Sequence, residues 1–210
     1  MKALRNALEA YSYEMRNNLD AYGNWEKYLD DETRKTFLAD LNVAIEWIYA
    51  EGETAPKSEY KMRIDKFKKI GEPVKARHFY YSELEVYYSQ FEKVAETVNQ
   101  KLGSIEHLTD SQKETINEKL RTTETLIAGV KADRASKQLH QDPAYTLDQI
   151  INAIEKCKRE TEAIFNLPPP KSKPEESTAD SGEKKTEADA KAPEADAEMK
   201  NEEPKAEEAK

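Results

Sequence analysis

The reactive side chains of this sequence are few and far apart. Its three histidines, His78, His107 and His140, have no cysteine or carboxylate at metal-ligand spacing, so we interpret them as surface residues. The six glycines include no cluster that could cradle a phosphate. Catalysis needs an acid, a base or a nucleophile brought together, and no such set can be found. The sequence therefore predicts a protein that binds rather than an enzyme, with no metal site and no cofactor in this chain.

Cys157 is the single cysteine, and it falls on the apolar stripe of the last expected helix. We interpret it as a buried small hydrophobe rather than a reactive thiol. One cysteine excludes an internal disulfide and suits a reducing compartment. No apolar run approaches the roughly 20 residues needed to cross a bilayer, and the charged start of the chain does not resemble a signal peptide. We expect a soluble, cytoplasmic protein that does not engage membranes.

The composition separates the end of the chain from the rest. Hydrophobic residues make up 37% and charged residues 36% of the 210 positions, which is poor in core-forming side chains. Residues 167–210 hold 8 lysines against 13 acidic residues and no aromatic residue. Such a segment cannot bury enough apolar surface to offset chain entropy, so we predict a disordered acidic tail there. The remaining charges are mixed in sign, without the basic stripe of a nucleic-acid-binding protein.

Residues 1–73 have the pattern of three amphipathic helices joined by short links. Asp30 or Asp31 supplies an N-cap for the second helix, and Pro56 fits the first turn of the third. Each helix has one apolar side that can be buried only against the others, which predicts a three-helix bundle. Trp47 and Tyr49 lie at the margins of the second apolar face, and we interpret them as rim packing rather than as ligand-binding residues. The helix breaks are expected at Gly23, Gly52, Gly71 and Pro73.

Residues 74–166 are expected to form a second set of long helices that extends the bundle. The first runs from about Val74 to Leu102 with apolar residues at alternating steps of four and three, a seam that needs a partner of comparable length. Capping boxes start the next two helices, and prolines 168 to 170 end the folded part. The seam consists of Tyr80, Leu84, Tyr87, Phe91, Val94, Val98 and Leu102, and the capping pairs are Thr109 with Gln112 and Thr146 with Gln149.

The first expected helix has two faces of different composition, which predict different neighbours. Leucines and other apolar residues recur every three or four positions and form a buried stripe. The opposite side carries an aromatic residue, an amide and charges of both signs, where solvated lysines and glutamates are the norm. This side is either an ordinary wet face or a docking surface. The stripe is Leu4, Leu8, Tyr11, Met15 and Leu19, and the opposite side is Lys2, Asn6, Glu9, Tyr13 and Arg16.

Four sequence motifs follow one another along residues 1–77. They are the segment from Asn6 to Arg16, the segment Glu46-Trp47-Ile48-Tyr49-Ala-Glu51-Gly52-Glu53, Tyr60, and the segment Ile70-Gly71-Glu-Pro73-Val74-Lys-Ala-Arg77. In this order they resemble the C-terminal helical region of the heat-shock protein 110 family, the large relatives of heat-shock protein 70. The similarity covers about residues 1–77, while residues 78–166 match only as further helices. The chain has no Glu-Glu-Val-Asp terminus, which favours this family over heat-shock protein 70 itself.

The resemblance implies a function. Members of this family are nucleotide exchange factors for heat-shock protein 70, and their three-helix bundle helps to hold the partner's nucleotide-binding domain open. In the family, the Asn and Glu of an N-x-L-E motif on the first helix touch that partner, and here they are Asn6 and Glu9. Tyr13 and Arg16 are added as neighbours from helix geometry alone. The implied partners are heat-shock protein 70 and unfolded client proteins.

The resemblance also implies parts that this sequence does not contain. Full-length members carry an ATP-binding domain and a β-sandwich before the helical region, so any ATP would bind outside this chain. We expect either a piece of a longer protein or a short relative that keeps only the docking module. The alternative function is a helical scaffold or assembly subunit without chaperone activity, in which the 74–102 seam pairs with another chain.

Overall fold

The computed structural model of the chain describes residues 2–169, and within this range it contains helices and no strand. The predicted all-α class is confirmed. Most of the predicted tail, residues 170–210, lies outside the described range. The long helices are α1 (Lys2–Leu19), α2 (Asp31–Tyr49), α3 (Lys57–Ser104), α4 (Asp110–Ser136) and α5 (Leu147–Phe165), and two short 3-10 helices are η1 (Glu26–Tyr28) and η2 (Glu51–Thr54).

The helix starts follow the predicted capping signals. The Asp30 side chain accepts a hydrogen bond from the Thr33 backbone N–H at 2.9 Å and so caps α2. Thr109 and Thr146 each form both hydrogen bonds of a capping box with the glutamine three positions later, which starts α4 and α5. Side chains within the sequence therefore satisfy backbone donors that a helix start leaves unpaired.

The predicted break at Gly71 and Pro73 is wrong, because α3 runs through both residues as one helix of 48 residues. Proline cannot donate a backbone hydrogen bond, so the carbonyl of Lys69 loses its partner. Pro73 and Lys69 are both exposed, so water can reach that carbonyl. Buried residues on the opposite side, Gly71 and Val74 among them, hold the helix in place. Tertiary packing therefore continues a helix that the local sequence would end.

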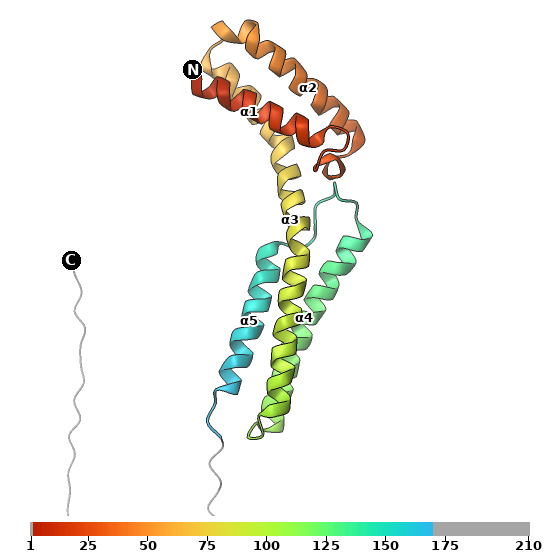
Figure 1. The fold of residues 1–210 in the computed structure, drawn as a ribbon, viewed down its shortest axis with the longest axis vertical. Helices are drawn as coiled ribbons and strands as arrows, with labels where there is room; N and C mark the ends of the chain where they lie inside the picture. Colours follow the sequence, from red (N-terminus) through yellow and green to blue (C-terminus); the bar gives the residue numbers. More distant parts are fainter. Residues whose placement is uncertain (1, 170–210) are drawn as a thin grey trace, which may run out of the picture. The chain divides into compact units, whose positions relative to one another are not determined.

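The apolar side chains of the described residues form two core clusters, and α3 contributes to both. Figure 1 shows α3 running from the pair α1 and α2 to the pair α4 and α5. The first cluster joins α1 and α2 to the start of α3, and the second joins the rest of α3 to α4 and α5. We call these two groups of helices the first bundle and the second bundle. The seam expected over 74–102 packs within the chain, with Tyr88 buried and Tyr87 only partly buried. Cys157 is 2% exposed in the second cluster, as predicted for a buried small hydrophobe.

Arg77 ties the two groups of helices together. Its Nε and Nη2 atoms donate to the Tyr28 carbonyl at 3.1 and 2.9 Å, and its Nη1 atom donates to Asp142 at 2.8 Å. The Tyr28 ring also packs edge-on against His78, with ring centroids 5.2 Å apart. The connector after α1 and the α4–α5 loop are therefore both attached to the middle of α3.

Candidate docking surface on the first helix

The residues of α1 divide into an inner and an outer face, as their spacing predicts. Leu8, Met15 and Leu19 are fully buried and Tyr11 is 8% exposed. A helix turns about 100° per residue, so Asn6 and Tyr13 project away from this stripe. Asn6 is exposed, and Tyr13 is partly exposed. The outer face of α1 is therefore open to another molecule within the described part of the chain.

The side of α1 next to α3 is already occupied. Lys75 of α3 forms an ion pair with Glu14 at 2.7 Å and lies 4.9 Å from the centroid of the Tyr11 ring. These contacts fill one flank of α1 with residues from the same chain. The space left for a partner is the outer face and the flank toward α2.

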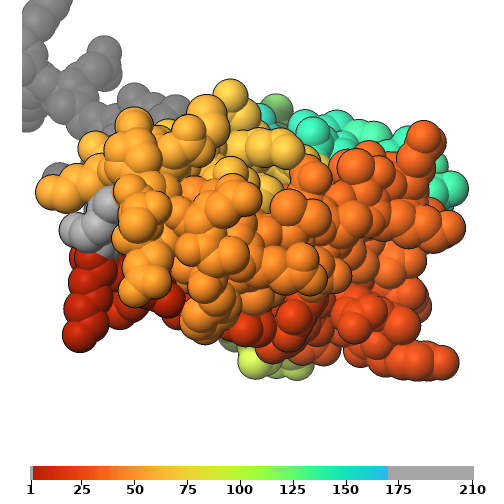
Figure 2. Space-filling model, turned by 90° about the horizontal axis from the view of Figure 1, so that it is seen from above, coloured from red at the N-terminus to blue at the C-terminus, as the bar shows by residue number. Residues whose placement is uncertain are grey.

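The flank toward α2 is built around Tyr49, the last residue of that helix. Its hydroxyl donates a hydrogen bond to the Glu9 carboxylate. The Arg5 guanidinium carbon lies 5.5 Å from the centroid of the Tyr49 ring, within cation–π range. Tyr49 is 58% exposed, so this cluster faces solvent. Figure 2 shows α1 in red along one edge of the face formed by α2 in orange.

The electrostatics of this cluster follow from the hydrogen bond. Because Tyr49 can donate only while it is protonated, the bond to Glu9 raises the pKa of Tyr49 to about 12. Tyr13 raises the pKa of Tyr49 further. The Arg16 guanidinium carbon lies 4.7 Å from the Tyr13 ring centroid. Glu9, Tyr13 and Arg16 follow one another at steps of four and three positions on α1, so they share one side of this helix.

We call this surface the α1–α2 face and define it by Arg5, Asn6, Glu9, Tyr13, Arg16 and Tyr49. It contains the four residues predicted from the sequence, of which Asn6 makes no side-chain hydrogen bond to another described residue. Arg5 and Tyr49 were missed as members. Their residue types are the sequence signal for membership of such a surface, because tyrosine and arginine are enriched at the energetic centres of protein interfaces.

Among residues 2–169, no group of three or more His, Cys, Asp or Glu side chains could hold a metal ion. No described helix is long and apolar enough to cross a membrane. The fold and the α1–α2 face define the described part as an all-α module with an open polar and aromatic surface.

Comparison with known proteins shows that the chain is similar to heat shock proteins. The chain is 30% identical over 196 residues to the 97 kDa heat shock protein of Strongylocentrotus purpuratus, an alignment that covers 85% of this chain and 20% of the relative. It is 30% identical to heat shock 70 kDa protein 14 of Arabidopsis thaliana, covering 87% of this chain and 22% of the relative. The match to human heat shock 70 kDa protein 4 is 29% identical over 175 residues, covering 80% and 20%.

The chain is a homologue of these heat shock proteins, and its match to the C-terminal helical region of the heat-shock protein 110 family, indicated by its motifs, is confirmed. It spans about a fifth of the length of the curated relatives it matches. No family model matches the chain. No solved structure matches it.

Proposed function

We propose that the chain is the helical part of a heat-shock protein 110-like co-chaperone that docks on the nucleotide-binding domain of heat-shock protein 70 and supports nucleotide exchange. The open α1–α2 face is the observation that supports this most directly, since Asn6 and Glu9 occupy it. The relatives named as heat shock proteins support a chaperone role. In this proposal the chain acts in the cytosol by binding, and ATP binds to other parts of a longer protein.

Holding of unfolded client proteins is a second part of the same proposal. The scaffold alternative depends on a free seam in residues 74–102. Four of the seven seam residues of α3 are buried in the second cluster, and the other three, Tyr87, Val94 and Leu102, pack partly buried against it. The seam of the described region is therefore already partnered by α4 and α5. The observations therefore favour docking through the first bundle over assembly through α3.

A binding titration against nucleotide-free heat-shock protein 70 tests the docking surface. We expect Asn6→Tyr combined with Glu9→Ala to weaken binding about tenfold or more, because the change adds bulk at the exposed Asn6 and removes the carboxylate of the partly exposed Glu9. The matched control is Asn99→Tyr combined with Glu96→Ala. These two residues have the same spacing, but they are exposed on the α3 segment of the second bundle.

The control should bind like the parent chain, and all three proteins should have the same helical circular dichroism. Equal affinity of the Asn6/Glu9 variant and the parent would remove the α1–α2 face as the docking surface. Equal loss in the control would mean that the substitutions act through general changes in charge and bulk.

A further inference from the structure

A groove between α3 and α5 in the second bundle has an apolar floor. Its volume is about 210 Å³, and its floor is formed by Val94, Val98 and Phe165. This volume is smaller than the about 300–1,000 Å³ of ordinary small-molecule sites. The groove therefore fits one bulky apolar side chain better than it fits a cofactor.

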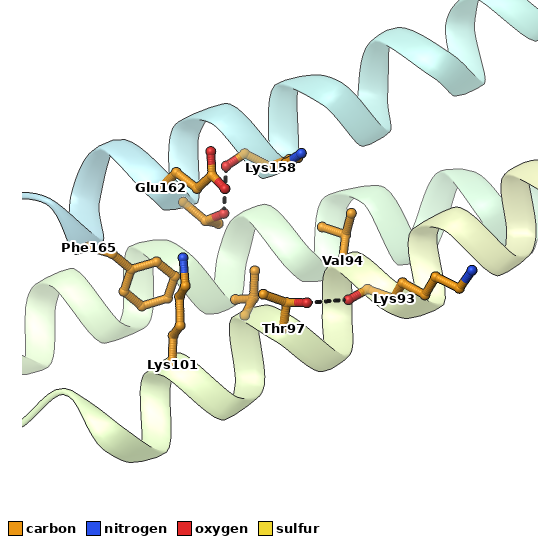
Figure 3. Close-up of a pocket in the computed structure, with 9 residues that line it drawn as sticks. Lys93, Val94, Thr97, Lys101, Lys158, Glu162 and Phe165 are labelled. Carbon is orange, nitrogen blue, oxygen red and sulfur yellow. Dashed lines mark hydrogen bonds between the residues drawn. The ribbon is translucent and has the colours of Figure 1, made fainter.

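Two threonines in the groove have no free hydroxyl proton to donate to a ligand. The Thr97 hydroxyl donates to the Lys93 carbonyl at 2.8 Å (Figure 3). The Thr161 hydroxyl donates to the Cys157 carbonyl at 2.8 Å. Because each hydroxyl is bonded within its own helix, each threonine contributes mainly its methyl group to the groove. Polar recognition is left to the charged residues at the rim.

The rim of the groove carries an excess of positive charge. Lys93 and Lys101 of α3 and Lys158 of α5 line it, against the single carboxylate of Glu162. Within the described part of the chain, none of the three lysines lies within 4.0 Å of a carboxylate oxygen. The Lys101 ammonium nitrogen lies 5.5 Å from the Phe165 ring centroid, at the edge of the apolar floor (Figure 3).

The groove between α4 and α5 shows the opposite arrangement. Its two lysines, Lys119 and Lys156, lie 3.1 and 3.8 Å from carboxylate oxygens of Glu160. Both lysines of the α4–α5 groove are thus paired with a carboxylate of the same chain, whereas the three lysines of the α3–α5 groove are not paired among the described residues. A ligand that brings carboxylates is therefore favoured more strongly in the α3–α5 groove.

We propose that the α3–α5 groove binds an acidic peptide segment of another protein, with one bulky apolar side chain on the floor and carboxylates on the lysines. Lys93 and Lys101 are eight positions apart, which is about 12 Å along a helix. About four residues of an extended peptide span that distance. The expected pattern is therefore an acidic residue on each side of an apolar one, each separated from it by one position. Nothing in this proposal depends on the α1–α2 face.

A titration of the full chain with the peptide Gly-Glu-Ser-Leu-Ser-Glu-Gly tests the proposal. Binding is monitored by the NMR signals of the methyl groups of Val94, Val98 and Thr161. We expect saturable shifts confined to the groove, which vanish at about 1 M salt, where charges are screened within about 3 Å. Replacing the peptide's leucine by serine should abolish the shifts. Lys93→Glu combined with Lys158→Glu should weaken binding about fivefold or more. Thr97→Phe, which fills the groove without changing charge, should also weaken it.

The matched control is Lys35→Glu combined with Lys68→Glu, an equal change in net charge at exposed sites of the first bundle. It should leave peptide affinity unchanged. Equal binding of the serine peptide, or equal affinity of the Lys93/Lys158 variant, would overturn the proposal. So would competition by a peptide copy of residues 170–210, which would assign the groove to the chain's own acidic segment. Self-association that the Lys93/Lys158 variant abolishes would assign it to a second copy of the chain.

Discussion

The hydrogen bond between Tyr49 and Glu9 makes the α1–α2 face sensitive to high pH. The bond raises the pKa of Tyr49 to about 12, compared with about 10 for a free tyrosine. A raised folded-state pKa means that the stabilisation is complete below about pH 10 and is lost as the pH rises toward 12. We predict that Glu9→Gln moves the pKa of Tyr49 down toward its ordinary value, measured by NMR of labelled tyrosine. Tyr49→Phe identifies the resonance, and an unchanged titration in Glu9→Gln would contradict the assignment.

At the residue scale, spacing along one helix could be predicted and contacts between helices could not. The inner stripe of α1 follows from three- and four-residue steps, so Leu8 and Met15 could be placed in the core from sequence. Tyr49 is 40 positions from Glu9, and its contact depends on how α2 is rotated against α1. The sequence alone therefore indicates only rim packing for Tyr49. The structure shows that its hydroxyl donates a hydrogen bond to Glu9.

At the element scale, two glycines near helix ends should respond in opposite ways to alanine. A Cβ atom on Gly23 would meet the backbone carbonyl of Asn18 and lie 2.9 Å from the Asp20 carbonyl oxygen, and backbone cannot easily move aside. A Cβ on Gly103 would meet nothing within 4 Å. We predict that Gly23→Ala lowers the free energy of unfolding by about 1–3 kcal/mol, whereas Gly103→Ala raises it by up to about 1 kcal/mol. Urea unfolding of both variants measures this, and a loss of stability in Gly103→Ala would show that its surroundings are not open.

The starts of the helices could be read from sequence, but the continuity of α3 could not. A capping box is a local device, complete within four residues, so Thr109 and Thr146 mark their helices without outside help. Pro73 is also a local signal, and alone it favours a break. The helix nevertheless continues through Pro73, because Val74 packs in the first cluster and Tyr80 in the second. One continuous helix therefore contributes to both cores. Only the tertiary structure supplies that information.

At the scale of the described region, the sequence indicated two sets of helices but not how they are joined. Two apolar clusters follow from the number and length of the amphipathic segments. The domain boundary at residue 73 stays a prediction. Helix α3 crosses this position without interruption. The connection depends on Arg77, which is 9% exposed and bonds to residues 49 and 65 positions away. Nothing in the local pattern distinguishes this arginine from the solvated ones.

Arg77 should therefore control whether the two clusters unfold together. Trp25 and Trp47 both pack against the first cluster, so tryptophan fluorescence reports that cluster while far-ultraviolet circular dichroism reports all helices. We predict that the two urea transitions coincide in the parent chain, because α3 and Arg77 couple the clusters. Arg77→Ala should separate the transitions and lower the free energy of unfolding by about 2 kcal/mol, since it leaves the Tyr28 carbonyl unpaired.

Asp142→Ala is the matched control for the same contact. The Asp142 side chain is 82% exposed, and an exposed ion pair contributes only about 0–1 kcal/mol. The two transitions should therefore stay together in this variant. If the Asp142 variant separated them as fully as the Arg77 variant, the ion pair would be the coupling contact. If neither variant separated them, α3 alone would transmit unfolding from one cluster to the other, and Arg77 would have no role in joining the bundles.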